Sequence, residues 1–241
     1  MRIAVIADIH GNFEAFKEVL AGIRTDHVDR IISLGDNVGY GPDPEPVMAL
    51  IRDHKIDSVL GNHEMAMKDN SFIAWFNPLA QKALLYTREN LSALSFEQIR
   101  TFPKSLVVDD MRFVHGAPPS SPVLYLFQIP DARLVKRLDV LEERIFFVGH
   151  THELMLIDYY GKDIRRNDLY PGEIHLEKGK KYMINVGSVG QPRDMDKRAK
   201  YVLYDTESGL LTVKSVDYPN TITADKIIRA GIPKQYAEKL L

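Results

Sequence analysis

The first quarter of the chain alternates short apolar runs with longer segments in which apolar residues recur every three or four positions. Ile3–Ala7 is an apolar run that predicts a buried strand, and the spacing after it predicts a helix over about Asn12–Arg24. The order then repeats, with strands predicted over Arg30–Leu34 and Asp57–Leu60 and a helix over Pro46–His54 between them. This alternation is typical of βαβ units around a largely parallel sheet.

A helical insertion is predicted at about 65–105. Asn77-Pro78 is typical of a helix start, and Ser95 with Gln98 predicts a capping box. Further elements follow it, namely strands over Leu106–Val108, Met111–Val114, Arg144–Val148 and Tyr182–Val186 and a helix over Pro130–Glu143. From Leu154 onward, short strands and turns predict a second, mainly antiparallel sheet packed on the first. We expect residues 1–241 to form a single domain.

Composition narrows the class of protein. The 241 residues are 45% hydrophobic and 27% charged, and the net charge is −2, as in ordinary globular enzymes. Because no strong basic surplus exists, we expect no binding to long nucleic acid. Because no apolar run approaches the roughly 18 residues of a membrane span, we expect a cytoplasmic protein without a membrane partner. The absence of cysteine leaves nitrogen and oxygen ligands for any metal ion.

Candidate metal ligands stand at the ends of the predicted strands. Strand ends are where open α/β sheets bind ligands, so residues far apart in sequence can converge there. The candidate ligands are Asp8, His10, Asp36, Asn62, His115, His150 and His152, and His63 is available beside them as a non-ligand. Burying such groups together without a cation would leave unpaired donors and charges. The other histidines, His27, His54 and His175, are interpreted as ordinary polar residues.

The residue types indicate hydrolysis at phosphorus. In a strand, Asp8 and His10 would share a face and could bind one metal ion, and His150 and His152 have the same spacing. Two divalent ions would leave a surplus of positive charge that favours a phosphate substrate. A pair of ions also activates water and stabilises an in-line displacement. His63 is available to protonate the leaving group.

The motifs together resemble those of the calcineurin-like metallophosphoesterase superfamily, and within it the small prokaryotic phosphodiesterase branch. The matching segments are Asp8-Ile9-His10-Gly11-Asn12, Gly35-Asp36-Asn37-Val38-Gly39, Gly61-Asn62-His63-Glu64, His115-Gly116, Gly149-His150-Thr151-His152 and Asn185–Asp194. The resemblance implies two mixed β-sheets packed face to face and flanked by helices in four layers. It also implies one metal ion on Asp8, His10, Asp36 and His152, a second on Asp36, Asn62, His115 and His150, and His63 as the catalytic imidazole.

Some candidate residues keep two interpretations. Family members generally have Asp after the catalytic histidine, so Glu64 either orients His63 or points to solvent. Asn12, Asn37 and Arg193 are candidate substrate contacts, although a helix cap is favoured for Asn12. For the aromatic residues of the insertion, a core or subunit contact is favoured over a nucleobase platform, and Tyr40 is a weaker candidate for shaping the pocket. These aromatic residues are Phe72, Trp75 and Phe76.

We therefore expect a dinuclear metal-dependent phosphoesterase. It would hydrolyse a phosphodiester, phosphomonoester or phosphoanhydride by in-line attack of a metal-bound hydroxide. Manganese is the favoured metal, with iron, zinc, nickel or cobalt as alternatives. The substrate would be a small, nucleotide-like phosphoester or a phosphoprotein. Assembly into a homo-oligomer is compatible with the sequence. Alternatives are a protein Ser/Thr phosphatase, a nuclease or a non-catalytic interaction scaffold, the last disfavoured because no ligand is missing.

Overall fold

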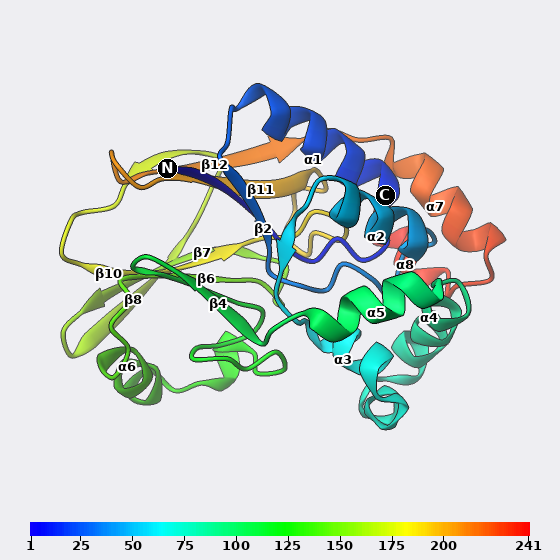
Figure 1. Ribbon diagram of the computed structural model, residues 1–241, viewed down its shortest axis with the longest axis horizontal. Helices are drawn as coiled ribbons and strands as arrows, with labels where there is room; N and C mark the ends of the chain where they lie inside the picture. The colour runs from blue at the N-terminus through cyan, green and yellow to red at the C-terminus, as the bar shows by residue number, and fades with distance from the viewer.

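Two six-stranded sheets lie at the centre of the computed structural model, which describes residues 1–241 (Figure 1). In spatial order, the first sheet contains β3 (Asp57–Ser58), β2 (Arg30–Ser33), β1 (Arg2–Ile6), β11 (Ala199–Asp205), β12 (Leu210–Val216) and β9 (Gly172–His175). The second contains β4 (Ser105–Val108), β5 (Met111–Val114), β6 (Ile145–Val148), β10 (Lys181–Val186), β7 (Leu154–Tyr160) and β8 (Asp163–Asp168).

Both sheets are mixed, which confirms the fold class but corrects how the strands are divided. Parallel pairs join β1, β2 and β3 in one sheet and β5, β6 and β10 in the other. The predicted division into an early parallel sheet and an antiparallel sheet from Leu154 onward is wrong, because β9, β11 and β12 return to the first sheet. An apolar run indicates that a strand is buried, but it does not indicate which strand pairs with it.

Helices cover the outer faces of the sheets and one end of the sandwich (Figure 1). They are α1 (Phe13–Thr25), α2 (Pro44–Asp53), α3 (Asn62–Lys68), α4 (Pro78–Glu89), α5 (Ala93–Thr101), α6 (Asp131–Asp139), α7 (Asn220–Arg229) and α8 (Gln235–Glu238). Two 3-10 helices are η1 (Asn70–Trp75) and η2 (Leu126–Gln128). Helix α1 packs against β11 and β12, and α6 packs against β8. No helix has the length and apolar character needed to cross a membrane.

Three buried apolar clusters hold the four layers together. Along β1, Ile3 and Val5 point between the sheets, whereas Ala4 and Ile6 pack toward the helices of the first sheet. This alternation follows from the two-residue period of a strand. A third cluster joins the second sheet to α6. Strand β1 is therefore buried on both faces, and its carboxyl end is fixed at the centre of the sandwich.

The segment predicted as a helical insertion contains most of α3 together with η1, α4 and α5. Asn77 caps α4 as predicted, since its Oδ1 accepts hydrogen bonds from two backbone N–H groups of the first turn. The capping box at Ser95 is wrong. Ser92 is the N-cap of α5 and accepts a hydrogen bond from the Ser95 backbone N–H at 3.2 Å, so the helix starts one turn earlier.

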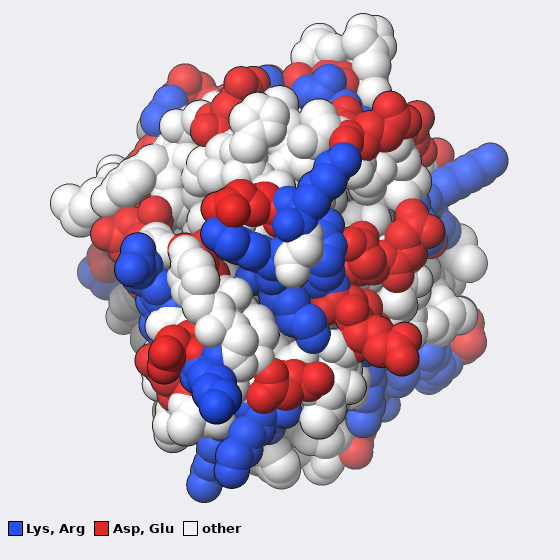
Figure 2. Space-filling view, turned by 90° about the vertical axis from the view of Figure 1, so that its left-hand side faces the viewer, with Lys and Arg blue, Asp and Glu red and all other residues white.

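The face where the chain starts carries charges of both signs. Basic and acidic side chains lie close together on it in Figure 2, which shows the left-hand side of Figure 1. Ion pairs near the starts of the strands include Arg30–Asp57 at 2.7 Å and Arg144–Asp110 at 2.8 Å. The candidate metal ligands lie at the opposite, carboxyl ends of β1 and β2.

Candidate metal centre

The loops that carry the candidate ligands have left-handed backbone. The φ angles are 54° at Asp8, 49° at His10, 53° at Asp36, 70° at His150 and 64° at His152. Non-glycine residues rarely adopt this conformation, and it concentrates at functional sites. The predicted strand geometry for these residues is therefore wrong. Their side chains converge because the backbone turns sharply after each strand.

Backbone hydrogen bonds tie these loops to one another. The His10 N–H donates to the Asp36 carbonyl at 2.9 Å, and the Gly149 N–H donates to the His115 carbonyl at 2.8 Å. The Asp8 carboxylate joins a third loop, because its Oδ2 accepts from the His150 N–H at 3.0 Å. The loops thus form one connected framework, and the side chains on it cannot shift independently.

The first cluster consists of Asp8, His10 and His152. The Nδ1 atoms of both rings donate to backbone carbonyls, at 3.1 Å for His10 and 2.6 Å for His152. Because a carbonyl only accepts, each neutral ring presents the lone pair of its Nε2. These two Nε2 atoms lie 3.1 Å apart, and Asp8 Oδ1 lies 3.4 Å from that of His152. Burial lowers the pKa of both rings well below its usual value, which favours the neutral form of each.

The second cluster consists of Asn62, His115 and His150. The His115 Nδ1 donates to the Leu34 carbonyl at 2.9 Å, which leaves its Nε2 3.0 Å from His150 Nδ1 and 3.1 Å from Asn62 Oδ1. Burial lowers the pKa of His150 to about 2. Burial would also lower the pKa of His115, but the Asp36 carboxylate outweighs it and raises this pKa to about 9. The Asp36 carboxylate thus favours the protonated form of His115.

Asp36 lies between the two clusters. Its Oδ1 accepts from the His63 N–H at 2.9 Å, and its Oδ2 lies 3.7 Å from His10 Nε2 and 3.3 Å from His115 Nε2. Burial alone would raise the pKa of this carboxyl, but the neighbouring His115 and His63 lower it well below its usual value. One carboxylate oxygen thus faces ring nitrogens of both clusters.

The residues fit a pair of cations. Asp8, His10 and His152 bring ligand atoms within 4.8 Å of one another, and so do Asp36, His115 and His150. Asp8 Oδ1 and His150 Nε2 are buried without a hydrogen-bond partner. Burial raises the pKa of Asp8 to about 7, as expected for a carboxyl that lacks a compensating charge. The arrangement is a histidine and aspartate cluster consistent with a dinuclear metal site.

His63 lies at the edge of both clusters. Its Nε2 is 3.8 Å from Asp36 Oδ2, and its ring packs edge-on against His10, Tyr40 and Phe76. A side chain at Gly39 would collide with the ring, so the absence of a Cβ there makes room for it. Burial lowers the pKa of His63 to about 4.

Glu64 has neither of the two predicted placements. It is fully buried, and its carboxylate accepts hydrogen bonds from the backbone N–H groups of Asp36, Asn37, Val38 and Gly61 at 2.7–3.3 Å. His63 Nδ1 has no hydrogen-bond partner. Glu64 therefore fixes the backbone of the Asp36 loop and does not orient the imidazole. Its longer side chain spans the distance from α3 to that loop.

Two of the three candidate substrate contacts are structural. Asn12 caps α1 through its Oδ1, which accepts from the Ala15 N–H at 3.1 Å, and its Nδ2 donates to the Gly190 carbonyl. Asn37 is buried, and it accepts from Ser33 Oγ and donates to Ser58 Oγ. These bonds give both buried carboxamides a structural role, and they place Asn12 as the cap of α1. A substrate contact of Asn12 or Asn37 stays a prediction.

Arg193 is exposed at the edge of the centre, and its backbone N–H donates to the His152 carbonyl at 3.3 Å. Burial raises the pKa of the Tyr125 hydroxyl, and the nearby Arg193 guanidinium opposes that shift. Tyr125 itself stacks on His150, with ring centroids 3.7 Å apart. The motifs did not predict Tyr125, and its only signal is an aromatic residue soon after His115-Gly116.

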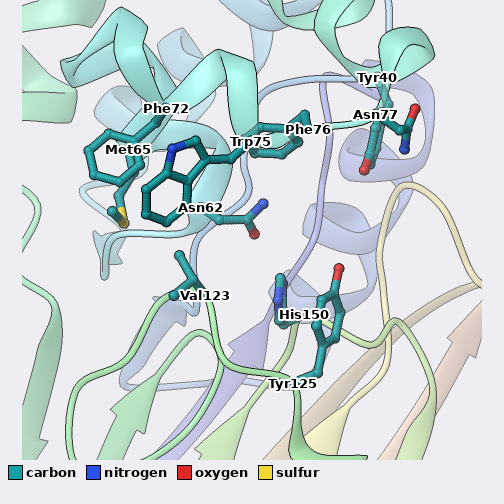
Figure 3. Close-up of a pocket in the computed structure, with 10 residues that line it drawn as sticks. All are labelled: Tyr40, Asn62, Met65, Phe72, Trp75, Phe76, Asn77, Val123, Tyr125 and His150. Atoms are coloured by element: carbon teal, nitrogen blue, oxygen red, sulfur yellow. The ribbon is translucent and has the colours of Figure 1, made fainter. Parts of the chain in front are cut away.

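A pocket of about 260 Å³ opens beside the second cluster (Figure 3). Ten residues line it, namely Tyr40, Asn62, Met65, Phe72, Trp75, Phe76, Asn77, Val123, Tyr125 and His150. Trp75 is 76% exposed and therefore has no core role, whereas Phe72 and Phe76 also pack partly against the core. The insertion thus contributes aromatic side chains to a wall of the site.

Histidine and aspartate side chains gathered at the strand ends of a two-sheet sandwich indicate a metal-binding class of protein. The family comparison agrees with this class. The model of the calcineurin-like phosphoesterase superfamily domain matches residues 1–209, so the chain belongs to that superfamily. The resemblance drawn from the motifs is confirmed.

Three relatives illustrate the membership. An uncharacterized protein of Methanocaldococcus jannaschii is 33% identical over 245 residues, covering 99% of this chain and 96% of its own length. The crystal structure of a metallophosphoesterase from Sphaerobacter thermophilus is 32% identical, with a TM-score of 0.85 and 100% and 98% of the two chains covered. Serine/threonine-protein phosphatase 2 of Escherichia coli is 36% identical over 172 residues, covering 66% of this chain and 77% of its own.

Proposed function

We propose that this protein is a dinuclear metal-dependent phosphoesterase. The observation that supports it best is the facing pair of His10 and His152 Nε2 lone pairs, 3.1 Å apart beside Asp8. Two such lone pairs repel each other in a buried site unless a cation lies among them. The first metal ion would be held by Asp8, His10, Asp36 and His152. The second would be held by Asp36, Asn62, His115 and His150.

The chain's own residues divide the work of hydrolysis. Bound divalent cations supply activation of water and neutralisation of phosphoryl charge. As the water oxygen forms the new bond to phosphorus it releases a proton to solvent, the ester P–O bond breaks, and the leaving oxygen takes a proton from the His63 ring, which solvent protonates again. A phosphoryl anion beside this ring raises its pKa and so favours the protonated form. Arg193, at the edge of the centre, would bind a phosphoryl oxygen with its guanidinium.

The proposal is tested by replacing the residue between the two clusters and one residue of the second cluster. Asp36→Asn and His115→Ala should abolish hydrolysis of bis(p-nitrophenyl) phosphate in Mn²⁺ and lower the metal content measured by mass spectrometry. His175→Ala is the matched control, because this histidine is exposed on β9. Turnover at the wild-type rate in both cluster variants would refute the proposal.

His63 should behave differently from the ligands. His63→Ala is expected to lower turnover about 10²- to 10⁴-fold, the usual contribution of a general acid, with about two metal ions retained per chain. Loss of metal from this variant would make His63 a ligand. Manganese remains our first choice of metal, and a series of Mn, Fe, Zn, Ni and Co reconstitutions identifies the ion that supports the highest turnover.

A protein phosphatase is the alternative that the named Escherichia coli relative favours, through its 36% identity. The catalytic chemistry would be the same, and only the group attached to the phosphate would differ. Comparing kcat/KM for a phosphoserine peptide with that for a nucleoside phosphoester separates the two functions. A higher value for the peptide would select the phosphatase.

A further inference from the structure

We propose that the pocket beside the second cluster binds the nucleobase of a nucleoside phosphoester. This inference rests on the proposed phosphoesterase function and names its substrate class. Asn62 and His150 line the pocket and also belong to the second cluster. A phosphoryl group held at that cluster would therefore place its neighbouring substituent in the pocket.

The lining suits a flat, uncharged ring. Figure 3 shows Phe72, Trp75 and Phe76 along one side of the pocket and Tyr125 and His150 on the other. None of the ten lining residues is Lys, Arg, Asp or Glu. Aromatic faces stack on nucleobases, whereas a charged peptide or a polyphosphate chain would need charges that this wall lacks.

The aromatic side chains are held in place without being covered. The Trp75 ring lies 5.1 Å from that of Phe72, which packs partly against the core, yet Trp75 is 76% exposed. On the other side, the Tyr125 ring stacks on His150 at 3.7 Å and with an interplanar angle of 20°. An exposed tryptophan costs solvation free energy unless a ligand covers it, and base stacking provides such a cover.

A polar group in the pocket can recognise the edge of a base. Asn77 Oδ1 accepts from the Leu79 and Ala80 backbone N–H groups at 3.1 and 3.0 Å. Its amide nitrogen is therefore the part that remains to donate to a ligand, and the oxygens and ring nitrogens of bases accept such a bond. With a volume of about 260 Å³, the pocket suits a compact ring more than a large ligand.

The first test is a binding measurement that needs no turnover. Trp75 is the only tryptophan in the chain, so intrinsic tryptophan fluorescence reports on this pocket alone. In the metal-loaded protein, adenosine 5′-phosphate should quench this fluorescence at concentrations where ribose 5-phosphate does not. Equal responses to the two ligands, or none to either, would overturn the proposal. Tyr170→Ala, which removes an exposed aromatic residue outside the pocket, should give the wild-type response.

The second test compares the same two ligands as inhibitors of bis(p-nitrophenyl) phosphate hydrolysis. They differ only in the base, so the ratio of their inhibition constants isolates its contribution. The wild type should favour the nucleotide about 5- to 100-fold, as base stacking on aromatic side chains predicts. Trp75→Ala should bring the ratio close to one, whereas Trp75→Phe and Tyr170→Ala should preserve it.

The two tests separate failure of the subsite from failure of the function. A wild-type ratio near one, or a ratio that Trp75→Ala does not change, overturns the subsite while hydrolysis persists. Dissociation of an oligomer in Trp75→Ala with an unchanged ratio overturns it too, and assigns Trp75 to a subunit contact. If the metal-loaded wild type hydrolyses no phosphoester, the proposed function fails, and the fluorescence result still decides whether the pocket binds a base.

Discussion

The metal centre and the aromatic pocket share Asn62 and His150, but their side chains are held in different ways. In the centre, Asp8 is fully buried, and its carboxylate accepts a hydrogen bond from a backbone N–H group, while the neighbouring rings donate to backbone carbonyls. In the pocket, Trp75 is 76% exposed and is positioned by aromatic contacts. A change in the centre therefore disturbs both the loops and the chemistry, whereas a change in the pocket can alter selectivity on an intact fold.

Metal removal should give the largest effect on stability, because only the centre depends on a cation. Excess Mn²⁺ over a chelated sample should raise the free energy of unfolding by about 3–4 kcal/mol at 100 to 1,000 times Kd. Urea unfolding with and without EDTA measures the difference. Asp36→Asn should lose this response, and Trp75→Ala should keep it. Equal stability of the wild type in both conditions would contradict a metal-dependent centre.

Glu64 tests whether the framework of the centre is as rigid as its hydrogen bonds indicate. Glu64→Gln and Glu64→Asp should each lower the free energy of unfolding by about 3 kcal/mol, because charged hydrogen bonds to backbone groups are lost or lengthened. Metal affinity should fall about 10- to 100-fold, as for other residues that position ligands. Both effects are measured by urea unfolding and metal titration.

The control for Glu64 is Glu97→Gln on α5, where the carboxylate is exposed. Its effect should stay within about 0.5 kcal/mol, as for most surface substitutions. A wild-type metal affinity in Glu64→Asp would show that the shorter carboxylate of other family members serves equally well here. The rigid-framework interpretation would then fail.

The sequence predicts which residues form the centre better than it predicts how the backbone places them. Short polar motifs after apolar runs identify the residues that meet, because a strand end fixes where the chain leaves the sheet. The left-handed backbone at Asp8 and His150 leaves no such signal, since neither residue is a glycine. The roles of Asn37 and Glu64 were equally hidden, because a polar side chain near a motif can bind a substrate or hold a loop.

Pairing between distant strands and the shape of the pocket were harder still to predict. Strand β11 lies beside β1 although nearly the whole chain separates them, and no local pattern encodes this partner. Phe72 and Trp75 are close in sequence, yet they have different exposures because only Phe72 reaches the core. The two residues lie one turn apart on the same face of η1, so tertiary packing sets the difference, and apolar periodicity does not resolve it.

Asn77→Asp should give the smallest effect and addresses the pocket alone. The aspartate keeps an oxygen that caps α4, so the free energy of unfolding should change by less than about 1 kcal/mol. Its negative charge would oppose an anionic substrate and lower kcat/KM for nucleoside phosphoesters about two- to fivefold at low salt. High salt should restore only part of this loss, because it screens the exposed charge but does not replace the Asn77 amide donor. Asn90→Asp, at the far end of α4, adds the same charge away from the pocket and should leave kcat/KM unchanged. If both variants lower kcat/KM equally, the effect comes from net charge, and Asn77 does not face the bound substrate.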